Sequence, residues 1–174
     1  DGKPHLPHLP PLASVTTRAR GAAATLGRAP AALGGLRPRP GRTRASGHRL
    51  AHESVRRRRE GDLDEAVALA REAVSAFRAA RDAHGEALAL NTLALALAQG
   101  HRYVEAVDAL DGALRLLAET GDRHREGTVL VNLGTLHRQA GGVESARFCW
   151  RKALERLDPA SPESRETERL LRAS

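Results

Sequence analysis

Histidine and cysteine are the side chains of this sequence best suited to binding a metal ion, but their spacing does not favour it. The eight histidines are scattered along the 174 residues, and His5 and His8 lie among prolines without further ligands nearby. The single cysteine, Cys149, excludes an internal disulfide and cannot form a cysteine-based metal site by itself. We therefore expect no metal, no cofactor, and surface or structural roles for the histidines.

The sequence also lacks the small-residue motifs that support catalysis. Gly141-Gly142 indicates a helix end, because no Lys-Ser/Thr pair follows it to complete a phosphate-binding loop. The serine elbow of hydrolases is absent as well. The sequence therefore predicts a protein that is not an enzyme and has no catalytic residues.

A run of four arginines, Arg56–Arg59, could attract the phosphates of nucleic acid. Residues 1–60 hold 13 Lys and Arg against three acidic residues, a net charge of +10, whereas the remainder carries −3. Such contacts neutralise phosphates without reading sequence, and they weaken steeply with salt. No Phe, Tyr or Trp occurs in residues 1–60 to stack on single-stranded bases. A small basic nucleic-acid-associated protein, binding weakly and non-specifically through residues 1–60, is the alternative function.

The first 46 residues differ in composition from all that follows. Residues 1–46 hold seven of the nine prolines, together with many Gly, Ala and Arg residues. Such a segment cannot bury enough apolar surface to offset the entropy lost on ordering. We expect residues 1–46 to be disordered and residues 47–174 to form the folded domain.

The overall composition indicates the kind of genome that encodes the chain and the compartment in which it resides. Ile and Met are absent and Lys occurs twice, while Ala, Arg, Gly and Pro are abundant, as a GC-rich bacterial genome would produce. No apolar run is long enough to span a bilayer, and a single cysteine fits a reducing compartment. We expect a cytoplasmic protein without membrane contact. Because the sequence does not begin with Met, we also expect a fragment or a processed product of a longer chain.

A repeat of 40 residues organises the rest of the sequence. Residues 86–125 align without a gap with residues 126–165, and an earlier copy precedes both. Alanine recurs at this offset, in the triplets Ala66, Ala106, Ala146 and Ala73, Ala113, Ala153. Small side chains recur where two helices touch closely, so the repeat predicts stacked helix pairs.

Apolar residues at helical spacing define the expected helices. Helices are expected at about residues 47–60, 85–99, 103–119, 124–140, 143–157 and 163–172, and a further helix begins at Asp62 and carries an apolar stripe from Leu63 to Phe77. Asp62 is expected to cap the second helix, with Glu65 three residues later. Gly100, Gly121 and Gly141 are expected to end helices in a left-handed conformation. The expected fold class is all-α, a solenoid of antiparallel helix pairs.

The pattern resembles the tetratricopeptide repeat, in its longer form of about 40 residues. In residues 86–125 the matching positions are Leu90, Leu93, Ala94, Tyr103, Ala106, Leu110 and Ala113. In residues 126–165 they are Leu130, Leu133, Gly134, Val143, Ala146, Trp150 and Ala153, and Asn132-Leu133-Gly134 is the family's familiar signature. In the preceding copy Ala66, Ala70 and Ala73 fit, whereas Glu53 and Ser54 replace the expected Leu and Gly/Ala. The resemblance implies about 2.5 to 3 repeats followed by a C-terminal capping helix.

The resemblance also implies a concave groove, lined by the first helix of each repeat, that holds a protein or peptide ligand. Carried over position by position, the groove residues are Leu88, Asn91, Leu95, Gln99, Thr128, Val131, Thr135, Arg138 and Gln139, with Ala98 beside them. Arg138 is nearly the only cation among these positions, which disfavours the paired Lys and Asn clamp of chaperone-binding members.

The function predicted from this resemblance is a non-catalytic protein–protein interaction scaffold. Repeats of this length in GC-rich bacteria resemble the C-terminal regulatory arrays of large transcriptional regulators, so a parent of that kind is implied. Self-association is a further expected mode, because the open ends of an array expose apolar helix faces.

Overall fold

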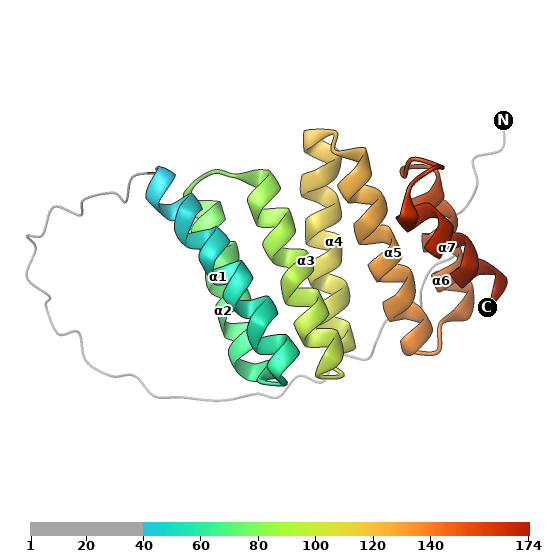
Figure 1. Ribbon diagram of the computed structural model, residues 1–174, viewed down its shortest axis with the longest axis horizontal. Helices are drawn as coiled ribbons and strands as arrows, with labels where there is room; N and C mark the ends of the chain where they lie inside the picture. Colours follow the sequence, from blue (N-terminus) through green and yellow to red (C-terminus); the bar gives the residue numbers. More distant parts are fainter. Residues whose placement is uncertain (1–39) are drawn as a thin grey trace, which may run out of the picture. The chain divides into compact units, whose positions relative to one another are not determined.

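The structure is a computed structural model that describes residues 40–174, with side chains from Thr43 onward. This part of the chain holds seven helices and no strand, which confirms the all-α prediction. The helices are α1 (Pro40–Glu60), α2 (Leu63–Ala79), α3 (Ala83–Gln99), α4 (Tyr103–Thr120), α5 (Arg123–Gln139), α6 (Val143–Leu154) and α7 (Pro162–Arg172) (Figure 1). Residues 1–39, the greater part of the segment for which disorder was expected, lie outside the described residues.

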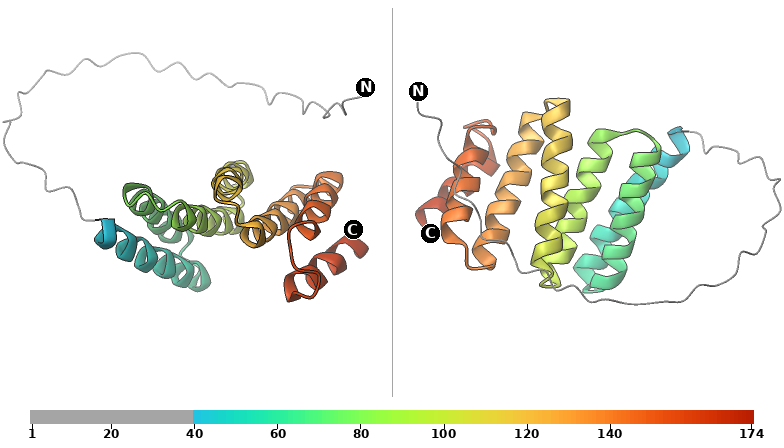
Figure 2. Two further views of the ribbon diagram at one scale, coloured as in Figure 1. Left: turned by 90° about the horizontal axis from the view of Figure 1, so that it is seen from above. Right: turned by 180° about the vertical axis from the view of Figure 1, so that it is seen from behind.

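Consecutive helices pack in pairs, and the pairs stack in chain order. Helix α1 packs on α2, α3 on α4 and α5 on α6, while α7 covers α6 (Figure 1). The first helices of neighbouring pairs also touch, α1 with α3 and α3 with α5. In the view from above, α4 and α7 lie on opposite sides of the stack (Figure 2). The first helices therefore share one side of the array, which we call the inner side.

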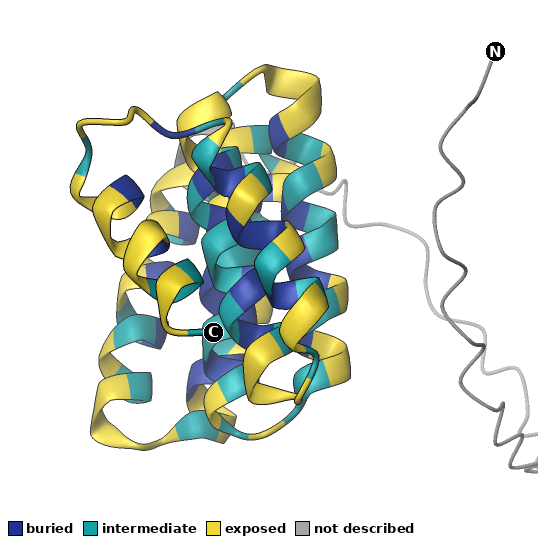
Figure 3. Cartoon of the chain, turned by 90° about the vertical axis from the view of Figure 1, so that its right-hand side faces the viewer, coloured by how far each residue is buried: buried dark blue, intermediate teal, exposed yellow. Residues whose placement is uncertain are grey.

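Small residues fill the contacts between paired helices, as the repeat predicts. Both alanine triplets of the 40-residue register are fully buried, namely Ala66, Ala106, Ala146 and Ala73, Ala113, Ala153. Trp150 is also fully buried and occupies the position of Leu110 in the previous repeat. The buried residues lie between the helices and the exposed ones on the outside (Figure 3). A bulkier side chain at an alanine position would overpack the core, at a cost of about 1–3 kcal/mol.

Helix α1 begins at Pro40, seven residues before the predicted start at about residue 47. Proline is well tolerated in the first turn of a helix, where its missing N–H leaves no bond unmade. Gly47 is buried, and a Cβ there would lie 2.9 Å from the Phe77 ring. This glycine therefore marks a close contact between α1 and α2. Ser54 is fully buried too and donates a hydrogen bond to the carbonyl of Ala66 at 2.7 Å, so the first repeat is a complete helix pair.

Two predicted helix ends differ in detail. Asp62 is the N-cap residue of α2, but its side chain makes no capping hydrogen bond and lies 3.5 Å from Arg57 Nη1 instead. At the end of α3 the left-handed residue is His101 (φ 58°), whereas Gly100 has φ −84°. The imidazole Nδ1 of His101 lies 2.9 Å from the hydroxyl of Tyr103. Gly121 (φ 70°) is left-handed, as predicted.

Candidate partner-binding groove

The inner side of the array is a groove that runs along α3, with α1 on one flank and α5 on the other. Two contacts fix α1 alongside α3. At the start of α3, Arg44 Nε donates to Asp82 Oδ2 at 2.5 Å, and at its end Arg58 Nη1 donates to Gln99 Oε1 at 3.3 Å. On the other flank, Asn132 of α5 donates to the side-chain oxygen of Asn91 on α3 at 2.8 Å. The groove floor is thus held to both flanks.

One hollow of about 290 Å³ occupies the end of the groove near the C-termini of α3 and α5. We call it the amide hollow, because Gln99, Asn132 and Gln139 line it together with Thr135 and Arg58. Its apolar lining consists of Ala94, Leu95, Ala98, Leu110 and Leu136. Carboxamides both donate and accept hydrogen bonds, so this surface can pair with a peptide backbone while the apolar lining covers a side chain.

Two further hollows lie near the N-termini of α3 and α5, and both are lined by Leu88 and Arg125. The basic hollow, of about 240 Å³, is lined by Arg44, His48, Asp82, His84, Gly85, Leu88 and Arg125. The α7 hollow, of about 520 Å³, extends toward Glu163 of α7 and is lined also by Ala87, Asn91, Leu117, Asp122, His124, Thr128 and Val129. Leu88 is 43% exposed, which makes it an accessible apolar contact at this end.

Seven of the nine groove residues predicted from the sequence line these hollows. Leu95, Gln99, Thr135 and Gln139 line the amide hollow, and Leu88, Asn91 and Thr128 line the α7 hollow.

The other two predicted groove residues, Val131 and Arg138, line none of the three hollows. The carbonyl of Val131 accepts a hydrogen bond from Trp150 Nε1 at 3.2 Å, and the Arg138 guanidinium lies 5.4 Å from the centre of the Trp150 ring. Seven residues make nearly two helical turns, so positions 131 and 138 share one face of α5, and both residues contact Trp150 of α6.

Several groove residues were missed from the sequence, among them every cation that lines it. Arg44, Arg58 and Arg125 line the hollows, so the statement that Arg138 is nearly the only groove cation is wrong. The 40-residue register did hold a signal, because position 44 coincides with His84 and His124. Arg44 was assigned to a disordered segment, however, and Arg58 to a charge run.

The carboxylates at the basic end of the groove lie beneath the arginines. Asp82 is 7% exposed and accepts from the backbone N–H of Gly85, which caps α3, whereas the Arg44 side chain is 60% exposed. Asp122 is 15% exposed and caps α5 through the N–H of Arg125, whose own side chain is 57% exposed. The guanidinium groups therefore form the outer surface of this end.

Burial alone would raise the pKa of both capping carboxyl groups. Hydrogen bonds from the Arg44 side chain and the Gly85 amide outweigh burial at Asp82, so its pKa is lowered. The Arg125 amide and guanidinium do the same for the pKa of Asp122. The His84 ring lies 3.4 Å from Asp122 and links α3 to α5. Both carboxylates are consequently ionised and engaged within the fold at neutral pH.

Comparison with known proteins identifies the repeats. A protein-family model of the tetratricopeptide repeat matches residues 85–158. These residues are tetratricopeptide repeats. The fold is also similar to the crystal structure of BtubC (BKLC) from P. vanneervenii, with a TM-score of 0.60 and 23% sequence identity. This match covers 76% of the present chain and 64% of BtubC, and at such identity it concerns the fold alone. A comparison with curated proteins gave no match.

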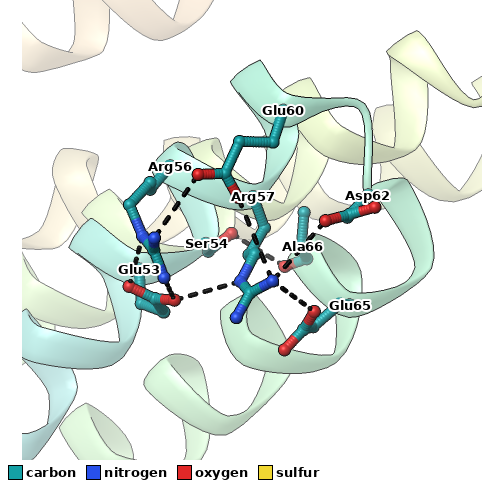
Figure 4. Close-up of polar contacts among 8 residues, drawn as sticks. All are labelled: Glu53, Ser54, Arg56, Arg57, Glu60, Asp62, Glu65 and Ala66. Atoms are coloured by element: carbon teal, nitrogen blue, oxygen red, sulfur yellow. Dashed lines mark hydrogen bonds and ion pairs between the residues drawn. The ribbon is translucent and has the colours of Figure 1, made fainter.

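Two of the four arginines in the run next to the tetratricopeptide repeats, Arg56 and Arg57, form ion pairs (Figure 4). Arg57 Nη1 lies 3.1 Å from Glu65 of α2, and its Nε lies 3.1 Å from Glu53. Arg56 bonds Glu53 and lies 3.4 Å from Glu60. The hydrogen bond from Arg56 is the main reason that the pKa of Glu53 falls to about 2. These arginines stabilise the first helix pair, which reduces what they can offer to phosphates.

The remaining candidate reactive groups are the Cys149 thiol, which lies in the core, and the possible metal ligands, which do not cluster. Cys149 is buried, and this burial raises the pKa of its thiol to about 11, so it is protonated at neutral pH. Within residues 40–174, no three His, Cys, Asp or Glu side chains gather closely enough to hold a metal ion. None of the helices that the structure describes has the length and apolar character needed to cross a membrane.

Proposed function

We propose that these tetratricopeptide repeats bind an extended segment of a partner protein in the groove along α3. Tetratricopeptide repeats indicate a protein–protein interaction scaffold. The observation that supports the groove as the binding site is the amide hollow, where three carboxamides surround apolar side chains from α3, α4 and α5. An extended peptide offers one N–H and one C=O per residue, which such carboxamides can pair.

The parent protein that we propose is a bacterial regulator in which the array responds to its partner in the cytoplasm. Support comes from the repeat length of 40 residues and from a composition without Ile or Met and with one buried cysteine. In that setting the array has no catalytic role and acts by binding.

The test is selection of peptides from a random library on the full chain. Selected peptides are then measured against a variant with alanine at Asn91, Gln99, Thr135 and Gln139, all of which line the groove hollows. We expect the groove variant to lose binding by about tenfold or more, since hydrogen-bonding and packing contacts of about 1 kcal/mol are removed at several positions.

A matched control variant carries alanine at Ser75, Asp108 and Glu119, which are exposed on α2 and α4. This control should bind the selected peptides as the natural sequence does, and thermal melts should show that both variants fold. Selected peptides that bind both variants equally well would place the binding surface outside the groove and refute the proposal.

A further inference from the structure

Arginine side chains line the groove at two places, one near each end of α3. At one end the exposed guanidinium groups of Arg44 and Arg125 pair with Asp82, which is buried, and with Asp122, which is partly buried. These carboxylates cap α3 and α5, whose N-termini each carry roughly half a positive charge. The basic hollow is therefore suited to an incoming carboxylate, whereas Glu163 on the far side of the α7 hollow would repel one.

At the other end, Arg58 is a cation without an acidic partner. Its guanidinium donates a hydrogen bond to the neutral carboxamide of Gln99, and among the described residues no carboxylate lies within ion-pair distance of it. Its Nε is also the one buried side-chain nitrogen or oxygen in the described part of the chain that lacks a hydrogen-bond partner. A buried donor without a partner is costly, more so on a charged group. Arg58 lines the amide hollow, where its guanidinium group, which has no acidic partner, can pair with a ligand's carboxylate.

The distance between the two places follows from helix geometry. Arg44 and Arg58 lie on the same helix, α1, and are 14 residues apart in the sequence. At 1.5 Å per residue this corresponds to about 21 Å along the groove. An extended peptide advances about 3.3 Å per residue, so about six residues span it, and an even number keeps both side chains on one face.

We propose that the groove binds an extended acidic segment of a partner, with one carboxylate at Arg44 and Arg125 and a second, about six residues along, at Arg58. The proposal rests on the proposed function and specifies the chemistry of its ligand. It concerns acidic side chains within a segment, so a chain terminus is not required. The amide hollow and Leu88 then contact the residues between the two acids.

The probes are three synthetic peptides of equal length, capped at both ends and uncharged apart from two glutamates. The glutamates are placed two, six or ten positions apart, and fluorescence anisotropy measures binding to the full chain. Because the three peptides carry the same charge, the arginines of residues 1–39 attract them equally. We expect the six-position peptide to bind tightest, by about twofold to fivefold for its second ion pair. Equal binding by all three, or no binding by any, would overturn the proposal.

Protein variants assign each carboxylate to its arginine. Arg58→Gln and Arg125→Gln should each weaken the six-position peptide by about twofold to fivefold and leave the two-position peptide less affected. Arg59→Gln is the matched control, because Arg59 is the next residue on α1, is exposed and has no ion pair in the structure. If Arg59→Gln weakens binding of the six-position peptide equally, general charge attraction explains the binding and the assignment of carboxylates to arginines is wrong.

Two other outcomes distinguish failure of the acidic-segment proposal from failure of the proposed groove function. If library-selected peptides need the groove but lack paired acids, the groove function stands and the acidic spacing is wrong. If a single-stranded oligonucleotide displaces the six-position peptide and itself loses affinity in Arg58→Gln, the two cations serve phosphates and the peptide proposal is wrong. Peptides with glutamine in place of each glutamate give the same test without changing the protein.

Discussion

Gly134 is the residue at which one methyl group would force α5 away from α6. A Cβ there would lie 2.5 Å from Trp150 Nε1 and 3.0 Å from the carbonyl oxygen of Ala146. The indole cannot move aside easily, because it is fully buried and donates a hydrogen bond to the carbonyl of Val131. We expect Gly134→Ala to lower the free energy of unfolding by about 1–3 kcal/mol, measured by urea denaturation.

Gly112 provides the control at the same scale. It lies inside α4, and its added Cβ would lie 3.3 Å from the flexible end of the Leu90 side chain. Alanine forms helices better than glycine, so Gly112→Ala should leave stability unchanged or raise it by up to about 1 kcal/mol. If both substitutions destabilise the protein equally, the close approach at Gly134 does not explain the glycine of the family signature.

At the scale of the element, α3 and α5 each depend on a capping aspartate at the N-terminus, which is buried in α3 and partly buried in α5. The pKa of Asp82 and that of Asp122 are both lowered from the ordinary value of 3.8, because burial is outweighed by hydrogen bonds from arginine and backbone amides. A lowered pKa means that the ionised form stabilises the fold. This stability is complete above about pH 5 and is lost as the pH falls below the ordinary value.

We therefore expect the urea midpoint of the protein to fall steeply with acid below about pH 4. Asparagine keeps the capping hydrogen bond without the charge, so Asp82→Asn with Asp122→Asn should cost about 0.5–2 kcal/mol in total at pH 7. The same double variant should show a shallower loss between about pH 5 and pH 3. The control is Asp108→Asn, an exposed residue of α4. If the urea midpoints of the natural protein and the double variant fall equally with decreasing pH, the capping carboxylates do not cause the loss of stability in acid.

The helices themselves were predictable, because the 40-residue register repeats the same contacts. Each alanine triplet fills an equivalent buried position, and the sequence alone shows the coincidence. The start of α1 was not predictable in this way. Pro40 and Gly47 are typical of loops, and only the Phe77 ring against Gly47 shows that this glycine belongs to a helix contact. The cap at Asp62 failed for a similar reason, since a side chain from another helix, Arg57, takes the carboxylate.

The 40-residue repeat predicts the groove-lining residues less completely than the core residues. Whether a side chain lines the groove depends on the rotation of its helix about the helix axis. Positions 88, 91, 95 and 99 on α3 line the hollows, whereas Val131 and Arg138 contact Trp150 of α6 instead. The binding role of all nine positions stays a prediction. Arg44 and Arg58 could be assigned to the groove only after α1 was seen to lie along α3.

For the described part of the molecule as a whole, both ends of the array are polar. The exposed large apolar side chains within residues 43–174 are Leu88, Val104, Val143 and Phe148, and none lies on α1 or α7. Helix α7 instead presents ion pairs, Arg169 with Glu166 and Arg172 with Glu168. Terminal elements with a polar outer face end a repeat array in solution. Among the described residues, the exposed large apolar side chains lie on other helices, and self-association through the array ends stays a prediction.

The charge of the chain is unevenly distributed, and this leads to a last prediction. It distinguishes a protein-interaction scaffold from a nucleic-acid-binding protein. Residues 1–39 carry six Lys and Arg against one acidic residue, so any attraction to phosphates should reside mainly there. Because α1 begins at Pro40, a deletion of residues 1–39 leaves the array whole. Each phosphate contact contributes about 0.9 to the slope of log K against log salt for duplex DNA, so this deletion should lower the slope by up to about five.

The arginines of α1 refine that measurement, because among the described ones three have a carboxylate partner and three do not. Arg56 and Arg57 bond carboxylates of α1 and α2, whereas Arg49 and Arg59 have no carboxylate partner in the structure. The double variant Arg49→Gln with Arg59→Gln should lower the DNA salt slope by up to about two, and Arg56→Gln with Arg57→Gln by clearly less. Melting curves should show a loss of stability for the second pair, since Arg57 joins α1 to α2. A larger slope change from Arg56 and Arg57 than from residues 1–39 would instead make the arginine run a phosphate-binding site and revive the nucleic-acid function.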